Sequence, residues 1–401
     1  MSERIPVTSK ADPAEPHAAH RAPARDVAVV GGSAAGLYAA TLLARKGQRV
    51  RVLERMDFND PIERTLIVTH RMRGILGRAA ESCIRNEIRR FEIFTDGRAA
   101  TVPLKRPDLI IERRALIQSL ADEARQEGVS VETGTRFHSL SPNHNGLVID
   151  FERCAGGQRE EAHVDTVIGG DGVASRVARC AGWAPLETAP LMQALVTLPK
   201  DMAPDTTRVW FVPQDTPYFY WLIPESPTRG ALGVIGTKGA ETRRCLENFL
   251  EKKKLDPIEF QGSRVPIYTG WIPVERKVGR SSVYLVGDAA AQVKVSTVGG
   301  TVTGFRGALG VVESILYGGR SPELRALRRE LDVHLLLRRS MHGFQQSDYS
   351  ELVDLLHEQA KAPLAEHTRD EAWQILWRVC LRQPRLILMG LRGLFLRNSR
   401  L

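Results

Sequence analysis

The chain lacks several features that would mark a secreted, metal-binding or membrane-spanning protein. Its five cysteines form no C-x-x-C pair, so neither a zinc site nor a disulfide framework is predicted. We expect them to be reduced and mostly buried. No stretch reaches the roughly eighteen uninterrupted apolar residues that a spanning helix needs. Residues 1–25 are rich in Pro, Ala and His and have no apolar signal-peptide segment, which predicts a disordered arm and a cytoplasmic protein.

Acidic residues are absent after Glu371, and this asymmetry accounts for most of the formal charge of +9. Six arginines in that tail leave an excess of only +3 for the rest of the chain. No basic run in the body is interleaved with aromatic residues, so a nucleic-acid partner is not expected. With 401 residues, 43% of them apolar and 26% charged, the chain suits two interleaved globular subdomains.

A strand, a helix and a second strand are predicted near the start of the chain. Residues 26–30 (DVAVV) predict a short buried strand and residues 49–53 (RVRVL) a second strand, and residues 37–46 predict a helix with apolar and small side chains. Between the first strand and the helix, Gly31 permits a tight turn. Gly36 lets the helix lie close to the strand and aim its N-terminus at a pyrophosphate. This βαβ unit is either a dinucleotide site or an ordinary turn.

Two side chains bear on that choice. Ser33 stands where the dinucleotide fingerprint has its second glycine, which brings a Cβ near the phosphates but also offers a hydroxyl donor. Glu54 ends the second strand, where a carboxylate can accept hydrogen bonds from an adenosine ribose and would repel a 2′-phosphate. The cofactor-binding residues predicted in this unit are Gly31, Gly32, Ser33, Ala35, Gly36, Glu54 and Arg55.

Three later segments extend the pattern: residues 111–116 (IERRAL), 167–176 (VIGGDGVASR) and 287–300 (GDAAAQVKVSTVGG). In this order they resemble the FAD-binding segments of the p-hydroxybenzoate hydroxylase superfamily. The last segment resembles the geranylgeranyl reductase branch most, and the resemblance covers about residues 26–320. It implies an α/β fold with a Rossmann-type FAD-binding domain interleaved with a mixed-sheet substrate domain, followed by a helical C-terminal region.

The resemblance also implies roles for single residues. Arg113 would support the FAD phosphates, for which a guanidinium offers a rigid fork of donors. Asp171 and Gly172 lie in a Gly-Asp-Gly turn that would let the backbone approach the cofactor. Gly287 and Asp288 follow an apolar strand, and the Asp288 carboxylate would accept from a ribityl hydroxyl.

Gly299 and Gly300 would open a helix whose positive end stabilises the anionic reduced flavin. Two residues depart from the branch in this loop: Val295 stands where it commonly has proline, and Val298 where it has glycine. These departures affect the stiffness of the turn and its fit against the flavin. A bound metal is not predicted.

The predicted organisation follows from the order of these segments. It comprises an arm at 1–25, a first part of the FAD-binding domain with some substrate-domain strands at 26–200, a substrate-domain sheet at 201–275, a second part of the FAD-binding domain at 276–320 and a helical region at 321–401.

The aromatic run at residues 218–224 (YFYWLIP) is the predicted substrate wall. It resembles the aromatic-x-Trp-x-Phe-Pro strand of geranylgeranyl reductases and, less completely, the Trp-x-Trp-x-Ile-Pro strand of flavin halogenases. Tyr220 and Trp221 are therefore candidates for a pocket that binds an apolar small molecule or lipid. A strand in the protein core would look similar.

Reduction of an alkene needs hydride from flavin N5 and a nearby weak acid. The candidate catalytic residues are Tyr218, Tyr220 and His70. The cysteine motif that the branch often has is missing from residues 64–71, so the proton delivery of the branch does not carry over directly. A monooxygenase or halogenase acting on an apolar or aromatic molecule is the alternative chemistry, and a flavin-binding protein without turnover is the alternative of another class. No second glycine-rich βαβ unit is evident, so electrons would come from transiently bound NAD(P)H or a carrier protein.

Residues 384–396 form the last predicted helix, with apolar side chains among arginines. A basic helix without acids can lie on an anionic bilayer, which would make the protein peripheral to the membrane. The other interpretation is a terminal helix docked on the body with its arginines in water.

Overall fold

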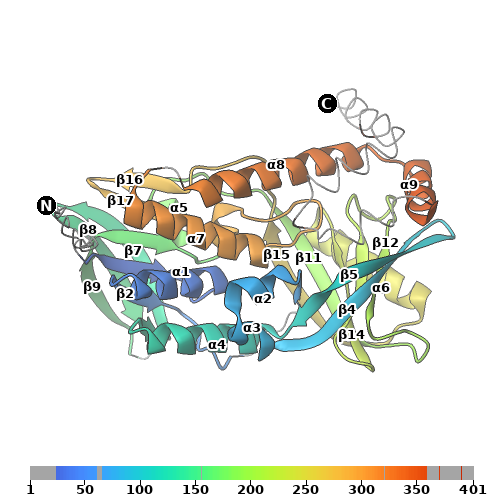
Figure 1. The fold of residues 1–401 in the computed structure, drawn as a ribbon, viewed down its shortest axis with the longest axis horizontal. Coiled ribbons are helices and arrows are strands. Elements are labelled where there is room, and N and C mark those ends of the chain that lie inside the picture. Colours follow the sequence, from blue (N-terminus) through green and yellow to red (C-terminus); the bar gives the residue numbers. More distant parts are fainter. Residues whose placement is uncertain are drawn as a thin grey trace, which may run out of the picture.

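A computed structural model describes residues 24–60, 66–154, 156–319 and 321–358, together with Asp370 and Gly390. Its two large sheets lie towards opposite ends of the long axis, joined by helices that run between them (Figure 1).

The first sheet carries the predicted βαβ unit. In spatial order its strands are β16 (Glu275–Val278), β17 (Ser281–Leu285), β10 (Thr166–Gly169), β1 (Asp26–Val30), β2 (Arg49–Leu53) and β6 (Ser130–Glu132). All neighbours are parallel except β16, which is an antiparallel edge. Strands buried on both faces read as nearly continuous apolar runs, which is why β1 is visible in the sequence, whereas β2 alternates arginine with valine before Leu53.

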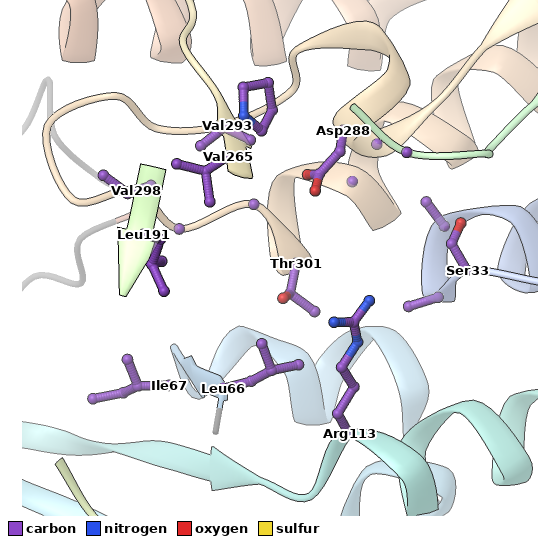
Figure 2. Close-up of a pocket in the computed structure, with 18 of the residues that line it drawn as sticks. Ser33, Leu66, Ile67, Arg113, Leu191, Val265, Asp288, Val293, Val298 and Thr301 are labelled. Atoms are coloured by element: carbon purple, nitrogen blue, oxygen red, sulfur yellow. The ribbon is translucent and has the colours of Figure 1, made fainter. Parts of the chain in front are cut away.

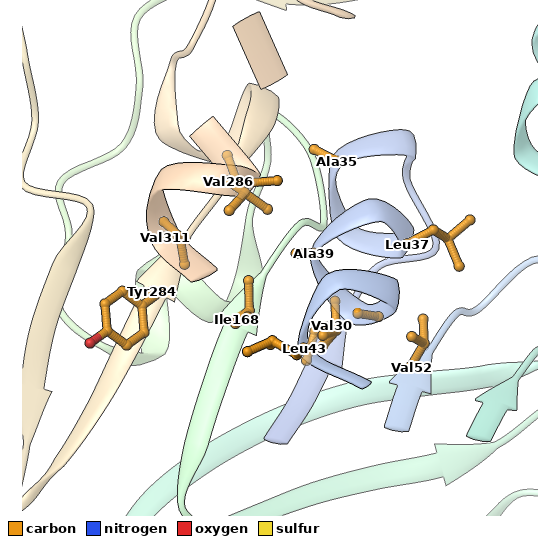
Figure 3. Close-up of a cluster of buried hydrophobic side chains, with 14 of the residues drawn as sticks. Val30, Ala35, Leu37, Ala39, Leu43, Val52, Ile168, Tyr284, Val286 and Val311 are labelled. Carbon is orange, nitrogen blue, oxygen red and sulfur yellow. The ribbon is translucent and has the colours of Figure 1, made fainter. Parts of the chain in front are cut away.

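Helices and a small sheet pack around this first sheet. The helices are α1 (Ala34–Arg45), α4 (Arg113–Gln126) and α7 (Thr301–Tyr317), and the small sheet is formed by β7 (Thr135–Asn143), β8 (Gly146–Arg153) and β9 (Gln158–Val164). Leu37, Leu43, Ile168 and Val311 belong to one buried cluster between α1, α7 and the strands (Figure 3). The small residues of α1 and α7 let the two helices pack closely beside each other.

The second sheet has eight strands and mixed pairing. In spatial order they are β15 (Pro257–Pro266), β11 (Thr188–Thr197), β14 (Arg229–Ile235), β13 (Tyr220–Pro224), β12 (Thr206–Trp210), β4 (Ile84–Thr95), β5 (Arg98–Ile111) and β3 (Leu66–Val68). The β12–β4 pair is parallel and the other pairs are antiparallel. Helix α6 (Gly239–Lys253) packs on this sheet through Leu246, Phe249 and Leu250.

Six short or C-terminal elements complete the described fold: α2 (Arg71–Leu76), α3 (Arg78–Glu81), α5 (Arg176–Cys180), the 3-10 turn η1 (Gly287–Ala290), α8 (Pro322–His342) and α9 (Gln346–Glu358). Helix α8 runs beside α7 towards the second sheet, and α9 contacts the β4–β5 hairpin (Figure 1).

The predicted fold class is confirmed, because strands of the two large sheets alternate along the chain.

The prediction of mostly buried thiols is wrong: of the four cysteines in the described part, Cys83 is buried, Cys245 is half-buried, and Cys154 and Cys180 are exposed. The arm up to residue 23 and nearly all of the helix expected at 384–396 lie outside the described residues. Within the described part, no helix is both long enough and apolar enough to cross a membrane.

Candidate flavin and substrate site

A cavity of about 1470 Å³ lies between the two large sheets. Sites for one drug-sized ligand are usually about 300–1,000 Å³, so this cavity has room for a dinucleotide and a second molecule. Ser33, Arg113, Asp288 and Thr301 lie on one side of it, and apolar side chains such as Leu191 lie on the other (Figure 2).

The turn between β1 and α1 forms the polar end. Gly31 has φ +100°, and a Cβ placed there would lie 2.6 Å from the carbonyl oxygen of Gly170. A Cβ on Gly36 would lie 2.4 Å from the carbonyl oxygen of Gly31. Both glycines are therefore required by close backbone contact, which leaves the N-terminus of α1 open to the cavity, where it can bind an anion.

Ser33 and Glu54 hold this turn in place. The Ser33 hydroxyl caps α1 by accepting a hydrogen bond of 3.2 Å from Gly36 N. The Glu54 carboxylate accepts from Gly32 N at 2.6 Å and from Met56 N at 2.9 Å. Each carboxylate oxygen keeps a free lone pair, so Glu54 can also accept from a ribose hydroxyl.

Arg113 and Asp288 line the same end of the cavity, and their charges interact. Arg113 opens α4 and points its guanidinium towards Thr301 and Ser33 (Figure 2). Burial lowers the pKa of Arg113, and the negative charge of Asp288 partly offsets that effect. A buried cation beside an anion suits phosphate or ribityl oxygens, which can replace part of the lost hydration.

The start of α7 closes this part of the cavity. Gly299 and Gly300 both line it, and no side chain caps the helix at Gly300. A Cβ on Gly300 would lie 3.1 Å from Asp288 Oδ1, so the carboxylate lies against the turn that opens the helix. The α7 N-terminus is thus available to stabilise negative charge in the cavity.

Asp171 lines the cavity but also has a structural task. Its carboxylate accepts from Ser175 Oγ and from Arg176 N, both at 2.6 Å, which fixes the start of α5. Burial raises its pKa, and these hydrogen bonds oppose that shift. Its neighbour Gly172 has φ +80° and also lines the cavity.

The apolar end is built on one face of the second sheet, to which all eight strands contribute at least one lining residue. Trp221 and Ile223 of β13 face the cavity. Tyr220 faces the other way, stacks on Phe249 of α6 at 4.0 Å between ring centroids, and donates to Asp215 Oδ2 at 2.9 Å. Successive side chains of a strand point to opposite faces, so the expectation that Tyr220 is a pocket or catalytic residue is corrected.

Tyr218 also lies behind the cavity wall rather than on it. Its ring packs under the guanidinium of Arg338, 3.8 Å from the ring centroid. Burial raises the pKa of Tyr218, with the charge of Arg338 acting in the opposite direction. The structure therefore does not bring Tyr218 to the place expected of a proton donor.

His70 is the catalytic candidate that the structure does bring to the cavity. Arg106 Nη1 lies 3.0 Å from His70 Nε2. Burial lowers the pKa of His70, and the neighbouring Arg106 lowers it further. Both effects disfavour the protonated imidazolium.

The two departures in the flavin loop have visible consequences. Val298 has φ +52°, a left-handed backbone that costs a β-branched residue about 1–2 kcal/mol. Its side chain packs against the buried cluster that includes Trp221, Ile223 and Val265 at the cavity wall. Val295 is buried against Tyr268, Leu327 and Leu331. This apolar packing holds the loop at the position where a proline would restrict its backbone.

Several lining residues escaped the sequence reasoning. Arg136, Arg176 and Arg179 add positive charge at the polar end; Arg176 ends the segment at 167–176, whereas no local motif contains Arg136 or Arg179. Arg106 and Asp108 lie two apart on β5 and share its cavity face. A spacing of two residues places side chains on the same face of a strand, and this is the signal that the sequence offers for these two residues. Paired strands are not predicted from the sequence in this region.

Comparison with known proteins agrees with this geometry. Residues 24–313 match the FAD-binding domain family. Over 375 residues the chain is 26% identical to a digeranylgeranylglycerophospholipid reductase of Methanosarcina acetivorans, covering 83% of this chain and 88% of that protein. A second such reductase, from Methanothermobacter thermautotrophicus, is 29% identical over 288 residues, covering 69% and 73% of the two chains.

Solved structures show the same fold. A geranylgeranyl bacteriochlorophyll reductase-like protein from Thermoplasma acidophilum superposes with a TM-score of 0.76 at 20% identity, covering 92% of this chain and 99% of that one. The flavin-dependent halogenase CmlS follows with 0.64 at 15% identity, covering 90% and 78%.

The chain therefore belongs to the FAD-binding domain family and is an FAD-dependent oxidoreductase. Within that superfamily it falls in the geranylgeranyl reductase-like branch.

Proposed function

We propose that this protein reduces carbon–carbon double bonds of a polyprenyl lipid. The observation that carries the proposal is the two-part cavity: a polar end built for a dinucleotide opens directly onto an apolar end formed by a whole sheet face. The reductase relatives, named for geranylgeranyl lipids, support a long apolar substrate.

The residues of the polar end fit FAD. The glycine turn and the α1 N-terminus would hold the pyrophosphate, Glu54 the ribose, and Arg113 with Asp288 the phosphate and ribityl oxygens. When bound there and reduced, FAD would supply the hydride. NAD(P)H or a carrier protein would supply its electrons.

The residues of the apolar end would orient the lipid and exclude water. Trp221, Ile223 and Val265 provide an apolar wall, and Val298 joins it from the flavin loop. His70 would deliver the proton to the second alkene carbon, because of the three candidates it is the one at the cavity. We also propose that the protein meets its lipid at the membrane surface from the cytoplasm.

The decisive measurement follows the flavin of the holoenzyme in the absence of oxygen. The FAD is reduced with dithionite, mixed with digeranylgeranylglycerophospholipid in detergent micelles, and its visible absorbance is recorded while products are identified by mass spectrometry. We expect the oxidised absorbance to return without oxygen and the lipid to gain two hydrogens per double bond. Lipid whose double bonds are already saturated is the matched control and should leave the flavin reduced.

Other results would favour the alternatives. Reoxidation that requires oxygen and yields an oxygenated or halogenated product would replace the reductase proposal with a monooxygenase or halogenase. A flavin that neither the lipid nor oxygen reoxidises, over a range of apolar and aromatic substrates, would point to a flavin-binding protein without turnover.

A further inference from the structure

A buried carboxylate outside the cavity connects three segments that are far apart in the sequence. The Asp370 side chain has no exposed surface and forms an ion pair with Lys294, whose side chain is 6% exposed. Its second oxygen accepts a hydrogen bond from the hydroxyl of Thr69, which is itself buried.

Lys294 closes the loop that leads from Asp288 to α7. Lys294 N donates to the carbonyl oxygen of Gly299 at 3.1 Å, and Lys294 O accepts from Val298 N at 2.7 Å. On either side of these bonds, Val293, Val298 and Gly299 line the cavity. The Lys294 side chain lies behind the loop, where its ammonium meets Asp370, so the ion pair holds the cavity-lining backbone from the rear.

The same carboxylate reaches the segment that carries the candidate proton donor. Thr69 directly precedes His70, which lines the cavity. A shift of Asp370 would therefore move both the loop beside the flavin site and the backbone next to His70. Ser296 in the loop is held separately by His334 of α8, with 2.6 Å between Oγ and Nδ1.

We propose that Asp370 is a positioning residue of the flavin site. It fixes the loop at residues 293–300 through Lys294 and the His70 segment through Thr69, and it neutralises a buried cation next to the site. The inference requires FAD binding, which the family establishes, but it does not require the reaction proposed above.

The buried charges give the test its logic. Removing one partner of a buried ion pair leaves an uncompensated charge, whereas replacing both with apolar groups is often neutral. Asp370→Asn would leave a cation near the flavin and favour its anionic reduced form, and Lys294→Met would leave an anion and disfavour it.

The experiment compares the purified full-length wild type with Asp370→Asn, Lys294→Met and the double variant Lys294→Met/Asp370→Leu. For each, FAD affinity is measured by fluorescence titration of the apoprotein, and the midpoint potential of bound FAD by spectroelectrochemistry. Both single variants are expected to bind FAD at least tenfold more weakly. Their potentials should shift in opposite directions, upward for Asp370→Asn and downward for Lys294→Met, by about 30 mV for a tenfold change in the two-electron equilibrium.

The double variant should regain most of the FAD affinity and lie near the wild-type potential. Glu247→Gln, which breaks an exposed pair with Arg243 on α6, is the matched control and should change neither quantity. Thermal unfolding of each apoprotein reports folding separately. If the single variants unfold at lower temperature but bind FAD with wild-type affinity and potential, Asp370 belongs only to the core and the proposal is overturned.

Thr69 provides a second test that keeps the ion pair intact. Thr69→Val removes the hydroxyl at nearly constant volume and should alter the circular dichroism of bound flavin, while Thr69→Ser should restore it. An unchanged flavin signal in Thr69→Val would remove the proposed link to the His70 segment. If neither single charge variant folds, this pair and the double variant decide the question.

Discussion

His70 shows how burial and neighbouring charges together set the protonation of one side chain. A guanidinium only donates, so the contact with Arg106 makes His70 Nε2 the acceptor and places the proton of the neutral ring on Nδ1. Burial and Arg106 lower the pKa of His70, while Asp108 and Asp370 act in the opposite direction. At neutral pH the protonated form of His70 is therefore a minor species. If this form donates the proton to the substrate, the rate of the reaction should rise as the pH falls.

His70→Gln removes the candidate general acid from the cavity. Loss of a general acid typically slows proton transfer about 10²–10⁴-fold, so we expect that loss in flavin reoxidation by the lipid, with FAD affinity unchanged. Wild-type turnover should rise as the pH falls below about 6.5, the ordinary pKa of histidine, and the variant should lack this rise. Rapid-mixing kinetics over a pH series measures both effects.

The control is His144→Gln, which changes an exposed histidine in the turn between β7 and β8 and should leave the pH profile unaltered.

The lowered pKa of His70 also fixes how its contribution to folding stability changes with pH. Since the folded state disfavours protonated His70, the contribution of His70 to stability is complete above about pH 6.5 and is lost as the pH falls towards its lowered pKa. If turnover of His70→Gln still rises at low pH, a group other than His70 delivers the proton to the substrate.

Among the described glycines, Gly36 of the β1–α1 turn would make the shortest contact between an added Cβ and a backbone atom. A methyl group on Gly36 would lie 2.4 Å from the Gly31 carbonyl oxygen, and backbone cannot yield as a flexible side chain can. Gly36→Ala should therefore separate α1 from β1 and open the anion-binding turn. We expect at least a tenfold loss of FAD affinity, measured by fluorescence titration, together with a lower unfolding temperature.

Gly74→Ala is the matched control for that substitution. Gly74 is exposed in α2, and a Cβ there would meet nothing within 4 Å. Because alanine is favoured over glycine inside a helix by about 1 kcal/mol, this variant should be as stable as the wild type or more so, with normal FAD affinity. Equal FAD affinity in Gly36→Ala and Gly74→Ala would mean that the turn does not hold the cofactor.

The same elements show where sequence reasoning succeeds and where it fails. Strands β1 and β2 were predicted at their observed bounds, since β1 is a nearly continuous apolar run before the glycine turn and β2 alternates arginine with valine. Helix α1 begins three residues earlier than predicted because Ser33 caps it. The β4–β5 hairpin was missed, because its exposed charges and two bulged registers obscure the alternation.

At the scale of the whole molecule, the second sheet separates two environments. One face packs on α6 around Tyr220 and Leu222, and the other carries the cavity with Trp221 and Ile223. The sequence run at 218–224 is apolar or aromatic at every position, so its pattern could not say which side chains face which way. The pairing of β13 between β12 and β14, together with the placement of α6, makes that choice.

This separation predicts that substitution of Tyr220 affects stability and substitution of its neighbour Trp221 affects turnover. Tyr220→Phe removes a hydroxyl that donates to Asp215 and should lower the free energy of unfolding by about 1 kcal/mol, measured by urea denaturation, with kcat/KM within twofold of wild type. Trp221→Phe shortens the wall that packs over Gly233 and should lower kcat/KM for the lipid about tenfold, equivalent to about 1.4 kcal/mol in the transition state.

The comparison is informative because the two side chains are adjacent in sequence but lie on opposite faces of one strand. Any general damage to β13 would reduce stability and turnover together in both variants. A fall in kcat/KM in Tyr220→Phe at unchanged stability would instead return its hydroxyl to the list of proton donors. A loss of stability in one variant and of kcat/KM in the other requires that substrate contacts the sheet only on its cavity face. The same sheet then forms the hydrophobic core with one face and the wall of the binding site with the other.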